Sequence, residues 1–420
     1  MSQFRITGRI PLSGTVRISG RKNAALKPIA ATLLTDSDSV LRRVPAIGDV
    51  ATMFRILESM GASVSDEGGG TYRVNTSAVS DPTIPEDLGR KLRASLILVG
   101  PLLARFGRAV FPHPGGCVIG KRSIAPHLLA FERLGAKIEF DGTTYTITSE
   151  RLTGDTVYLK ERSVTGTENL IMASVRAAGT TRIMNAAEEQ HIVNLCDYLR
   201  TLGYQVSGDG TSHVVVNGSD SLSSVPGEAT IIPDEIEIGT FACAALVTGG
   251  TVTLQGVGSP EGLLPITSKL DDFNAKYEFG DDSITLLPSN DLRAANVQTN
   301  PWPGFPPDLQ SPFTVLATQA KGTSLIHDWM YEGRLYFTDL LTKMGAEITI
   351  CDPHRALVTG PTPLTHSSLI TPDLRAGAAF VIAALAAEGT SIVEHVELID
   401  RGYDKIEERL SALGASIVRE

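Results

Sequence analysis

The sequence has few of the features that mark a disulfide-bonded or metal-binding chain. It has four cysteines, which lie far apart and form no CxxC pair: Cys117, Cys196, Cys243 and Cys351. Neither a zinc site nor a disulfide framework is therefore predicted. The eight histidines form no HxxxH or HExxH pattern. We expect no metal site, and separate free thiols suit a reducing cytoplasm.

Long apolar segments and excess basic charge are also lacking. Residues 1–6 contain no signal-peptide core, and the longest apolar run, 376–387, is shorter than the roughly 18 residues that a membrane helix needs. A net charge of -10 argues against a general nucleic-acid binder, which needs a basic surface. We therefore expect a cytoplasmic protein that binds neither membrane nor nucleic acid.

An internal repeat organises what is present. The junction Leu/Met-Gly-Ala followed by alternating apolar residues occurs six times, with variants, and successive copies lie 68 to 74 residues apart. The copies begin at Met60, Leu134, Leu202, Phe273, Met344 and Leu413. Gly or Asn just past a helix takes the left-handed conformation that caps free carbonyls. A second junction, Gly-Thr after an Ala/Leu-rich helix, recurs in step, as at Gly250-Thr251.

The repeat predicts an α/β architecture with sheets covered by helices. Each junction joins a helix with apolar spacing, as in Met53, Ile56 and Leu57, to a strand of alternating residues, as in 347–350. A chain of 420 residues is too long for one ordinary core. Three units per domain would give two similar lobes with a cleft between them, and clefts are preferred ligand sites. A repeat scaffold without chemistry is the alternative.

One segment departs from all other repeats and carries the first chemical signal. Residues 114–122 read Pro-Gly-Gly-Cys-Val-Ile-Gly-Lys-Arg. Three glycines let the backbone approach a ligand, and two cations close to Cys117 favour a reactive thiol. A buried structural cysteine is the alternative. The segment nearly matches a P-loop, but Arg122 stands where Ser or Thr would hold magnesium, so we reject a nucleotide triphosphatase.

Further cations and one acid lie in turns between repeats. Arginine suits carboxylates and phosphates because its planar fork donates two parallel hydrogen bonds. The cations are Arg21, Lys22, Arg93, Arg334, Arg375 and Arg401. Asp308 ends the apolar loop 302–307, where neighbouring rings would raise its pKa and make it a base. The alternative role for Asp308 is that of a helix N-cap.

Together these features resemble a known family, the UDP-N-acetylglucosamine 1-carboxyvinyltransferases, which are enolpyruvyl transferases. The resemblance runs the full length and rests on the order and spacing of these motifs: Lys22-Asn23, Arg93-Ala94-Ser95, 114–122, Phe305-Pro306-x-Asp308, Asp373-Leu374-Arg375 and Asp400-Arg401-Gly402-Tyr403. It implies two inside-out α/β barrels, each of three repeats of about 70 residues. It also implies that the first strand crosses between lobes, giving lobes 22–234 and 1–21 plus 235–420.

The resemblance implies a reaction and roles for residues. In this reaction the 3′-hydroxyl of UDP-N-acetylglucosamine attacks C2 of phosphoenolpyruvate, C3 is protonated, and phosphate then leaves. This is the first committed step of peptidoglycan precursor synthesis. The resemblance makes Cys117 the proton donor and Asp308 the group that takes the hydroxyl proton. It makes five cations ligands of the phosphate and carboxylate: Lys22, Arg93, Arg122, Arg375 and Arg401.

The acceptor side is implied in the same way. The residues at positions that bind substrate are Asn23, Ser163, Val164, Thr165, Glu189, Tyr331 and Asp373. The chain departs from the family at Ser123, Ala125 and Glu235, where many members have Pro, Asp and Arg. His191 and Asn194 also replace acids. These departures affect the acceptor side and leave the residues for phosphoenolpyruvate in place.

Two alternatives remain at this stage. One is enolpyruvyl transfer to shikimate 3-phosphate or another nucleotide, although the related shikimate enzyme uses no loop cysteine. The other is a catalytically inactive repeat scaffold. The setting of Cys117 further predicts that its thiol is alkylated by the epoxide fosfomycin.

Overall fold

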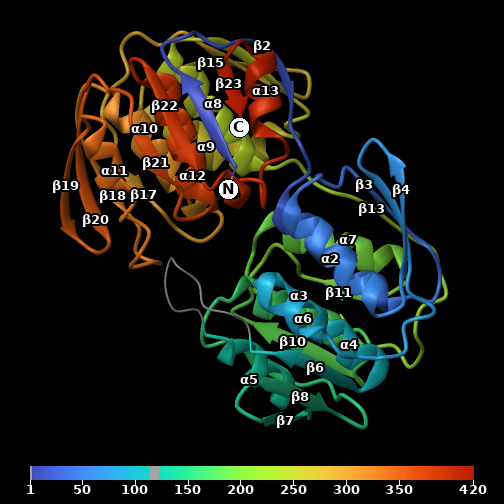
Figure 1. Ribbon diagram of the computed structural model, residues 1–420. Coiled ribbons are helices and arrows are strands. Elements are labelled where there is room, and N and C mark those ends of the chain that lie inside the picture. The colour runs from blue at the N-terminus through green and yellow to red at the C-terminus, as the bar shows by residue number, and fades with distance from the viewer. Residues whose placement is uncertain (1, 114–122) are drawn as a thin grey trace. The chain divides into compact units, whose positions relative to one another are not determined.

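The computed structural model describes residues 2–113 and 123–420. These residues form two compact units. Unit 1 contains residues 2–19 and 233–420, and unit 2 contains residues 20–113 and 123–232 (Figure 1). The chain passes between the units after Ser19 and again after Ile232. The lobe boundaries implied by the resemblance remain predictions.

Unit 2 holds three repeats. The first contains α1 (Lys22–Ala31), η1 (Thr32–Leu34), β3 (Ser39–Arg42), α2 (Gly48–Ser59), β4 (Ser63–Gly68), β5 (Thr71–Asn75) and the late strand β13 (Gly227–Thr230). The second contains α3 (Glu86–Lys91), η2 (Arg93–Leu98), α4 (Val99–Phe106), β6 (Arg108–Pro112), α5 (Ala125–Arg133), β7 (Lys137–Phe140) and β8 (Thr144–Thr148). The third contains β9 (Thr156–Tyr158), α6 (Val164–Ser174), β10 (Thr180–Met184), α7 (Gln190–Thr201), β11 (Gln205–Ser207) and β12 (His213–Asn217).

Unit 1 holds three more. The first contains β2 (Ser13–Arg17), α8 (Glu235–Thr248), β14 (Thr251–Gln255), η3 (Pro260–Leu263), α9 (Leu264–Asp272), β15 (Lys276–Gly280) and β16 (Ser283–Leu287). The second contains β17 (Val297–Gln298), η4 (Pro307–Leu309), α10 (Gln310–Thr318), β18 (Gly322–His327), α11 (Thr338–Lys343), β19 (Glu347–Asp352) and β20 (Arg355–Gly360). The third contains β1 (Gln3–Thr7), β21 (Ser368–Ile370), α12 (Leu374–Ala386), β22 (Thr390–Glu394), η5 (Val396–Leu398), α13 (Ile406–Ala412) and β23 (Ser416–Arg419).

The described residues form six sheets, one for each repeat. Five sheets have four strands in one pattern: an edge strand runs parallel to the next strand, and the remaining pairs are antiparallel. The sixth has the order β6-β8-β7, and a parallel bridge from Thr83 to Val110 takes the place of its edge strand. The six predicted units are therefore confirmed.

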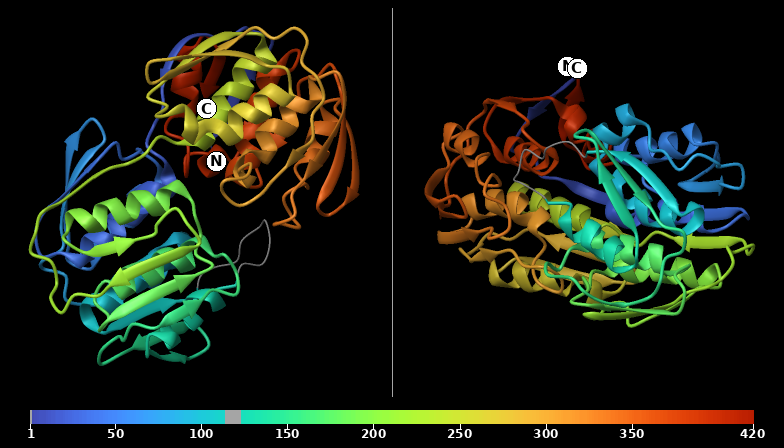
Figure 2. Two further views of the ribbon diagram at one scale, coloured as in Figure 1. Left: turned by 180° about the vertical axis from the view of Figure 1, so that it is seen from behind. Right: turned by 90° about the horizontal axis from the view of Figure 1, so that it is seen from below.

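Strands distant in sequence complete three of the sheets. Strand β13 pairs with β3, and β2 pairs with β14, both in parallel. Strand β1 lies between β22 and β23, so the two chain ends lie side by side within unit 1 (Figure 2). Unit 1 thus takes β1 and β2 from the start of the chain, whereas unit 2 is completed by β13, the last strand of its own stretch.

Each unit buries helices in its middle. In unit 1, α8, α10 and α12 contact one another and are buried along almost their whole length. In unit 2, α4 contacts α6, and η2 contacts both α1 and α6. These helices are apolar on nearly all sides, which is what a helix surrounded by protein requires. Some of their polar residues lie at or directly before the helix starts, and the predicted site residues are among these.

The helix-to-strand junctions have the predicted backbone. The second residues of the six copies have φ between 57° and 106°, Asn274 having the lowest value and Gly61 the highest. Each following N–H donates to a carbonyl five residues earlier, as from Ala346 to Leu341 at 3.1 Å. These are left-handed helix caps, so the predicted capping role is confirmed.

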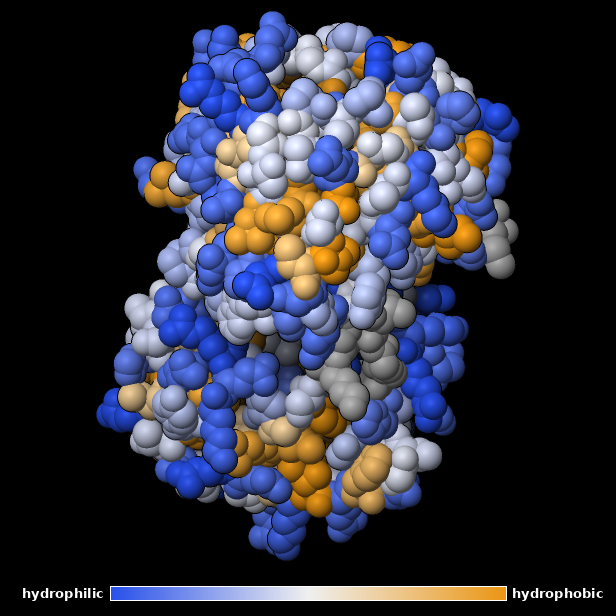
Figure 3. All heavy atoms as spheres, turned by 90° about the vertical axis from the view of Figure 1, so that its left-hand side faces the viewer, coloured by the Kyte–Doolittle hydropathy of each residue, from blue (hydrophilic) through white to orange (hydrophobic). Residues whose placement is uncertain are grey.

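Hydrophilic side chains cover most of the face drawn in Figure 3, and apolar side chains gather there in separate patches. The most exposed large apolar residues of the described chain include Tyr336, Tyr158 and Leu264. Within residues 2–113 and 123–420, none of the helices has both the length and the apolar character needed to span a bilayer.

Candidate active site

The predicted site residues of unit 1 lie where buried helices begin. Arg375 is in the first turn of α12, and Asp308 is in η4, directly before α10. Asp234 caps α8 by accepting hydrogen bonds from the N–H groups of Ile236 and Glu237. Its charge acts on Arg375, so the starts of the three helices converge. Helix N-termini carry partial positive charge, which favours anions at this end.

Asp308 lies between two guanidinium groups. Its Oδ2 accepts from Nε and Nη2 of Arg375 at 3.0 and 2.9 Å, and its Oδ1 accepts from Nη2 of Arg334 at 3.2 Å. The contacts described for the carboxylate are with two cations, which the apolar loop 302–307 did not indicate. The alternative role as an N-cap is wrong, since Leu309 holds that position of α10. Two cations at this distance stabilise the carboxylate form.

Arg375 is a buried cation at the start of α12. It is 5% exposed, and its guanidinium lies 5.3 Å from the ring centre of Tyr403. Burial alone would lower the pKa of Arg375, but the charges of Asp308, Tyr403 and Asp234 raise it above its ordinary value. Nη1 of Arg375 is buried and has no hydrogen-bond partner among the described residues. A buried donor of this kind can serve an anionic ligand.

Arg334 holds Asp308 from the other side. Its side chain is 2% exposed, and it packs over the ring of Tyr331 at 5.0 Å. Its Nε lies 3.6 Å from Asp328, a fully buried acid whose Oδ1 accepts from the backbone N–H groups of Met330 and Tyr331. Burial is the main cause that raises the pKa of Asp328. Arg334 therefore links Asp308 to the turn that carries Tyr331.

The remaining predicted residues of unit 1 have more distant or structural placements. Asp373 is the N-cap of α12, and its Oδ1 accepts from the N–H groups of Arg375 and Ala376. It thus fixes the helix turn that carries Arg375. Arg401 is half-buried in the turn that follows η5, two residues before Tyr403. Glu235, the first residue of α8, is buried.

In unit 2 the predicted cations again lie at helix starts. Lys22 is the first residue of α1, and its Nζ lies 2.6 Å from Oδ2 of Asp49 in α2. Asn23 follows it and is half-buried. Arg93 opens η2 and lies close enough to His127 for its charge to lower the pKa of that imidazole. The structure thus brings Lys22 to an acid that the sequence motifs did not indicate.

The start of α6 carries three residues predicted to bind the acceptor. Ser163 is the N-cap, and its Oγ accepts from the N–H of Gly166 at 3.2 Å. Val164 and Thr165 form the first turn and are half-buried. Oγ1 of Thr165 lies 3.0 Å from Nε2 of His127. Glu189 occupies the corresponding position before α7, and burial is the main cause that raises its pKa.

A buried charged cluster lies directly behind these helix starts. Lys27 of α1 and Glu168 of α6 are 3.3 Å apart, and their side chains are 4% and 0% exposed. Nε2 of His191 lies 3.3 Å from the other oxygen of Glu168. Burial, opposed by Lys27, raises the pKa of Glu168 to about 7. The same burial, with the charges of Arg21 and Lys27, lowers the pKa of His191.

Cys117 and Arg122 lie outside the described residues. Of the other cysteines, Cys196 and Cys243 are buried, and burial raises the pKa of both thiols. Cys351 is exposed on β19. Among the described residues no three or more His, Cys, Asp or Glu side chains are grouped to hold a metal ion.

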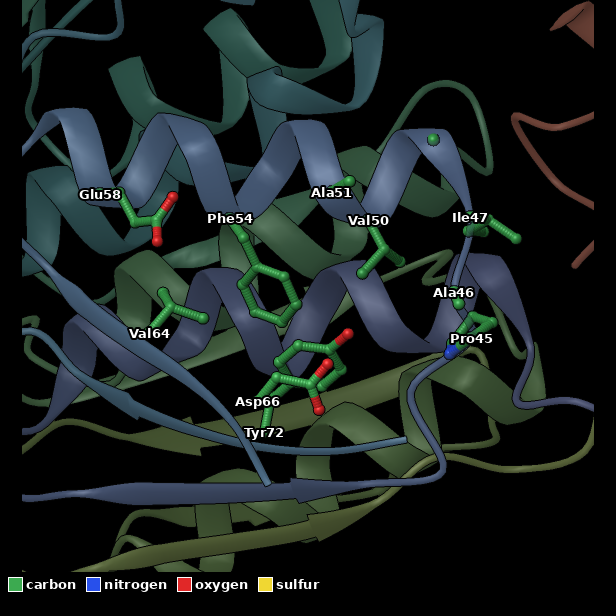
Figure 4. Close-up of a pocket in the computed structure, with 11 residues that line it drawn as sticks. Pro45, Ala46, Ile47, Val50, Ala51, Phe54, Glu58, Val64, Asp66 and Tyr72 are labelled. Carbon is green, nitrogen blue, oxygen red and sulfur yellow. The ribbon is translucent and has the colours of Figure 1, made fainter. Parts of the chain in front are cut away.

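One hollow in unit 2 lies away from this chemistry. It has a volume of about 540 Å³ and is lined mainly by apolar residues of α2, β4 and β5, with the ring of Phe54 against that of Tyr72 (Figure 4). Glu58 and Asp66 are the acids in its lining. Its lining includes none of the predicted site residues, so we do not place the active site there.

The sequence motifs missed residues that support the site from behind. They are Asp49, Lys27, His127, Glu168, Asn169 and Asp328. A signal was available in the repeats: every site residue in α1, η2, α6, η4 and α12 occupies the same place, the start of the buried helix of its repeat. A polar or charged residue at that place, inside an otherwise apolar helix, marks the site face of each repeat.

Known proteins are similar to this chain along its whole length. Residues 6–410 match the family described as EPSP synthase (3-phosphoshikimate 1-carboxyvinyltransferase). The UDP-N-acetylglucosamine 1-carboxyvinyltransferase of Treponema pallidum is 42% identical, over 100% of both chains. That of Wolinella succinogenes is 40% identical, over 100% of this chain and 99% of the relative.

Solved structures agree in fold. The enolpyruvyl transferase NikO from Streptomyces tendae superposes with a TM-score of 0.90 at 25% identity, over 100% of this chain and 98% of NikO. EPSP synthase from Acinetobacter baumannii shares the fold, with a TM-score of 0.77 at 18% identity over 100% of both chains. The predicted α/β enolpyruvyl transferase fold is thus confirmed. With a family match over most of its length and full-length relatives about 40% identical, the chain belongs to the UDP-N-acetylglucosamine 1-carboxyvinyltransferase family of enolpyruvyl transferases.

Proposed function

We propose that this chain transfers the enolpyruvyl group of phosphoenolpyruvate to the 3′-hydroxyl of UDP-N-acetylglucosamine and releases phosphate. The reaction would take place in the cytoplasm as the first committed step of peptidoglycan precursor synthesis. It requires no metal and no organic cofactor. The proposed roles draw on residues of both units.

The single observation that carries this proposal is the position of Asp308 between Arg334 and Arg375. A carboxylate held by two guanidinium groups is charged and has a fixed orientation. It can accept the proton of a hydroxyl group that attacks C2 of phosphoenolpyruvate. Fixed orientation matters because a well-placed base contributes roughly 10²–10⁴-fold to a proton transfer.

The proposed binding of phosphoenolpyruvate rests on the cations. The molecule carries a phosphate and a carboxylate on three carbons, so its site needs several positive groups. The buried Nη1 of Arg375 has no hydrogen-bond partner among the described residues and supports this role. The other proposed ligands are Lys22, Arg93, Arg122 and Arg401.

The proposed steps conserve atoms and charge. The hydroxyl oxygen bonds to C2 while Asp308 takes its proton, and C3 receives a proton from the thiol of Cys117. The thiolate of Cys117 then takes a proton from C3 of the tetrahedral adduct, and the C2–O bond to phosphate breaks, which restores the double bond. The proton held by Asp308 passes to the departing phosphate, so both side chains return to their starting states. Cys117 has this role by resemblance, since it lies outside the described residues. The proposed acceptor ligands are Asn23, Ser163, Val164, Thr165, Glu189, Tyr331 and Asp373.

Phosphate release with three acceptors tests the proposal. The purified chain and phosphoenolpyruvate are incubated with UDP-N-acetylglucosamine, with shikimate 3-phosphate or with UMP. Of the three acceptors, we expect only UDP-N-acetylglucosamine to support phosphate release. Phosphate release with shikimate 3-phosphate would show that this compound is the acceptor in place of UDP-N-acetylglucosamine. No phosphate release with any of the three would favour an inactive scaffold.

A further inference from the structure

A chain of hydrogen bonds in unit 2 ends on one of the proposed acceptor ligands. Asn169 in α6 is fully buried, and its Nδ2 lies 3.0 Å from Nδ1 of His127 in α5. Nε2 of His127 lies 3.0 Å from Oγ1 of Thr165. His127 itself is 3% exposed, whereas Thr165 is half-buried at the start of α6. The chain therefore leads from the interior to the surface that bears the proposed acceptor site.

Backbone groups fix the direction of these hydrogen bonds. Oδ1 of Asn169 accepts from the N–H of Gly100 at 2.7 Å, and its Nδ2 donates to the carbonyl of Leu96 at 2.9 Å. If the amide were flipped, Nδ2 would face the N–H of Gly100, donor against donor, and Oδ1 would face the carbonyl of Leu96, acceptor against acceptor. Nδ2 is therefore the donor toward His127, and Nδ1 of His127 must accept.

The tautomer of His127 fixes which atom donates in its hydrogen bond with Thr165. Burial, assisted by the charge of Arg93, lowers the pKa of His127 to about 3, so the imidazole is neutral at physiological pH. A neutral imidazole whose Nδ1 accepts carries its hydrogen on Nε2. Nε2–H therefore donates to Oγ1 of Thr165. The hydroxyl hydrogen of Thr165 then has to point elsewhere.

Ser163 is arranged in a comparable way. Its Oγ accepts from the N–H of Gly166, so its hydrogen also points away from the helix. Two hydroxyl donors thus stand together at the N-terminus of α6. Donors at such a position suit oxygen atoms of an anionic ligand.

We propose that Asn169 and His127 are positioning residues which fix the Thr165 hydroxyl as a hydrogen-bond donor to an oxygen atom of the nucleotide sugar. This inference rests on the proposed function, because Thr165 is an acceptor ligand only in that proposal. Asn169 and His127 touch no substrate themselves. They act by removing one of the two orientations that a threonine hydroxyl could otherwise adopt.

The hydrogen bonds from Asn169 through His127 to Thr165 form a relay. The tautomer of His127 tests this relay without any change at the site. Long-range ¹H–¹⁵N spectra of the ¹⁵N-histidine-labelled full chain report which ring nitrogen carries hydrogen, and the His127→Phe variant assigns the signals. We expect a neutral ring protonated at Nε2 from pH 6 to 8. A ring protonated at Nδ1, or at both nitrogens, would overturn the relay.

A double-mutant cycle tests its effect on the ligand. Asn169→Asp keeps the side-chain shape but replaces the donor by an acceptor, so His127 carries its hydrogen on Nδ1 and Thr165 must donate to Nε2. We expect UDP-N-acetylglucosamine to bind about tenfold more weakly to Asn169→Asp and to Thr165→Val, since each loses one hydrogen bond to the ligand. Thr165→Ser keeps the hydroxyl and should bind like the unmodified chain.

The double variant distinguishes a positioning role of Asn169 from an effect of its substitution on the fold. In the Thr165→Val background, Asn169→Asp should weaken binding of UDP-N-acetylglucosamine no further. An added loss of the same size would mean that Asn169→Asp acts through the fold and would overturn the proposal. Calorimetry distinguishes the two proposals. If UDP-N-acetylglucosamine does not bind to the unmodified chain, the proposed function is contradicted. If it binds to both single variants as tightly as to the unmodified chain, only the relay is contradicted.

Discussion

At the scale of single residues, the account depends on Asp308. Its motif marks it in the sequence, but its surroundings do not follow from the motif. Arg334 and Arg375 lie 26 and 67 residues away along the chain, and folding brings both to one carboxylate. Neither cation follows from the residues adjacent to Asp308 in the sequence, because neighbours in space need not be neighbours along the chain.

Asp308→Asn should lower kcat strongly while the chain stays folded. The amide oxygen can still accept from one guanidinium group, but the amide cannot take a proton. We expect kcat to fall by roughly 10²–10⁴-fold. Initial rates of phosphate release at saturating substrates measure it.

Asp352→Asn is the matched control. Asp352 also accepts from two guanidinium nitrogens, at 2.7 and 2.6 Å from Arg355, but on an exposed hairpin of the same unit. We expect its kcat to stay within twofold of the unmodified value, as is usual for surface pairs. Equal losses in the two variants would show that the carboxylate of Asp308 has no special role.

The environments of the four cysteines predict which thiol fosfomycin alkylates. Burial raises the pKa of the Cys196 and Cys243 thiols, which makes them inert, whereas Cys117 has cations beside it in the sequence. Fosfomycin should therefore alkylate Cys117 and leave the exposed Cys351 unmodified. Peptide mass spectrometry identifies the adduct. An adduct on Cys351 with Cys117 unmodified would contradict the proposed activation of the thiol.

At the scale of elements, the buried helices both hold the units together and carry the site. Their apolar residues pack in the core, while the predicted site residues lie at or directly before their starts. In unit 2 the pair of Lys27 and Glu168 joins α1 to α6 within the core. The pair thereby ties the helix that carries Lys22 and Asn23 to the helix that carries Ser163 and Thr165.

Breaking that pair from one side should destabilise the fold. Lys27→Met leaves a buried carboxylate without its cation, and at pH 8 we expect a loss of about 3 kcal/mol in the free energy of unfolding. The double variant Lys27→Met/Glu168→Gln removes both charges and should recover most of that loss. Urea unfolding followed by circular dichroism measures both. A double variant no more stable than Lys27→Met would show that the pair is not coupled.

Glu168 also predicts a dependence of stability on pH. The pKa of Glu168 is about 7 in the folded chain against an ordinary value of 4.5. Between these values the folded chain keeps a proton that the unfolded chain has released. The contribution of Glu168 is therefore complete below pH 4.5, falls as pH rises, and is lost above about pH 7.

The comparison with Lys27→Met/Glu168→Gln isolates this contribution. His127 titrates in both proteins and cancels in the difference. Burial, the main cause that lowers the pKa of His191, is the same in both proteins, so this imidazole stays neutral in both folded states. The free energy of unfolding of the unmodified chain should fall by about 3 kcal/mol relative to the double variant between pH 4.5 and 7. A difference that is constant or rises with pH would contradict the buried, protonated state of Glu168.

At the scale of the whole molecule, the six repeats were predictable because their signals are local. A glycine or asparagine with positive φ and an apolar helix before it stand within a few residues of each other. The exchange of strands was not predictable from such signals, since β13 and β2 pair with strands of distant segments. Only the resemblance to the family indicated that the first strand crosses between lobes.

The candidate site divides in the same way. Motifs marked Lys22 and Arg375 because ligand-binding residues recur in fixed local patterns, and the resemblance to the family indicated Thr165. The partners behind them, such as Asp49 for Lys22 and His127 for Thr165, lie in other repeats or at other helices. Supporting residues of this kind become visible only in the folded structure of each unit.

The most direct test of the account is the structure of the product. The chain is incubated with phosphoenolpyruvate and UDP-N-acetylglucosamine, and the nucleotide fraction is analysed by proton nuclear magnetic resonance and mass spectrometry. The account predicts two vinyl protons of an enolpyruvyl ether on the 3′-oxygen of the sugar, together with one phosphate released per ether formed. Unchanged UDP-N-acetylglucosamine, or an ether formed only when shikimate 3-phosphate is supplied, would contradict it.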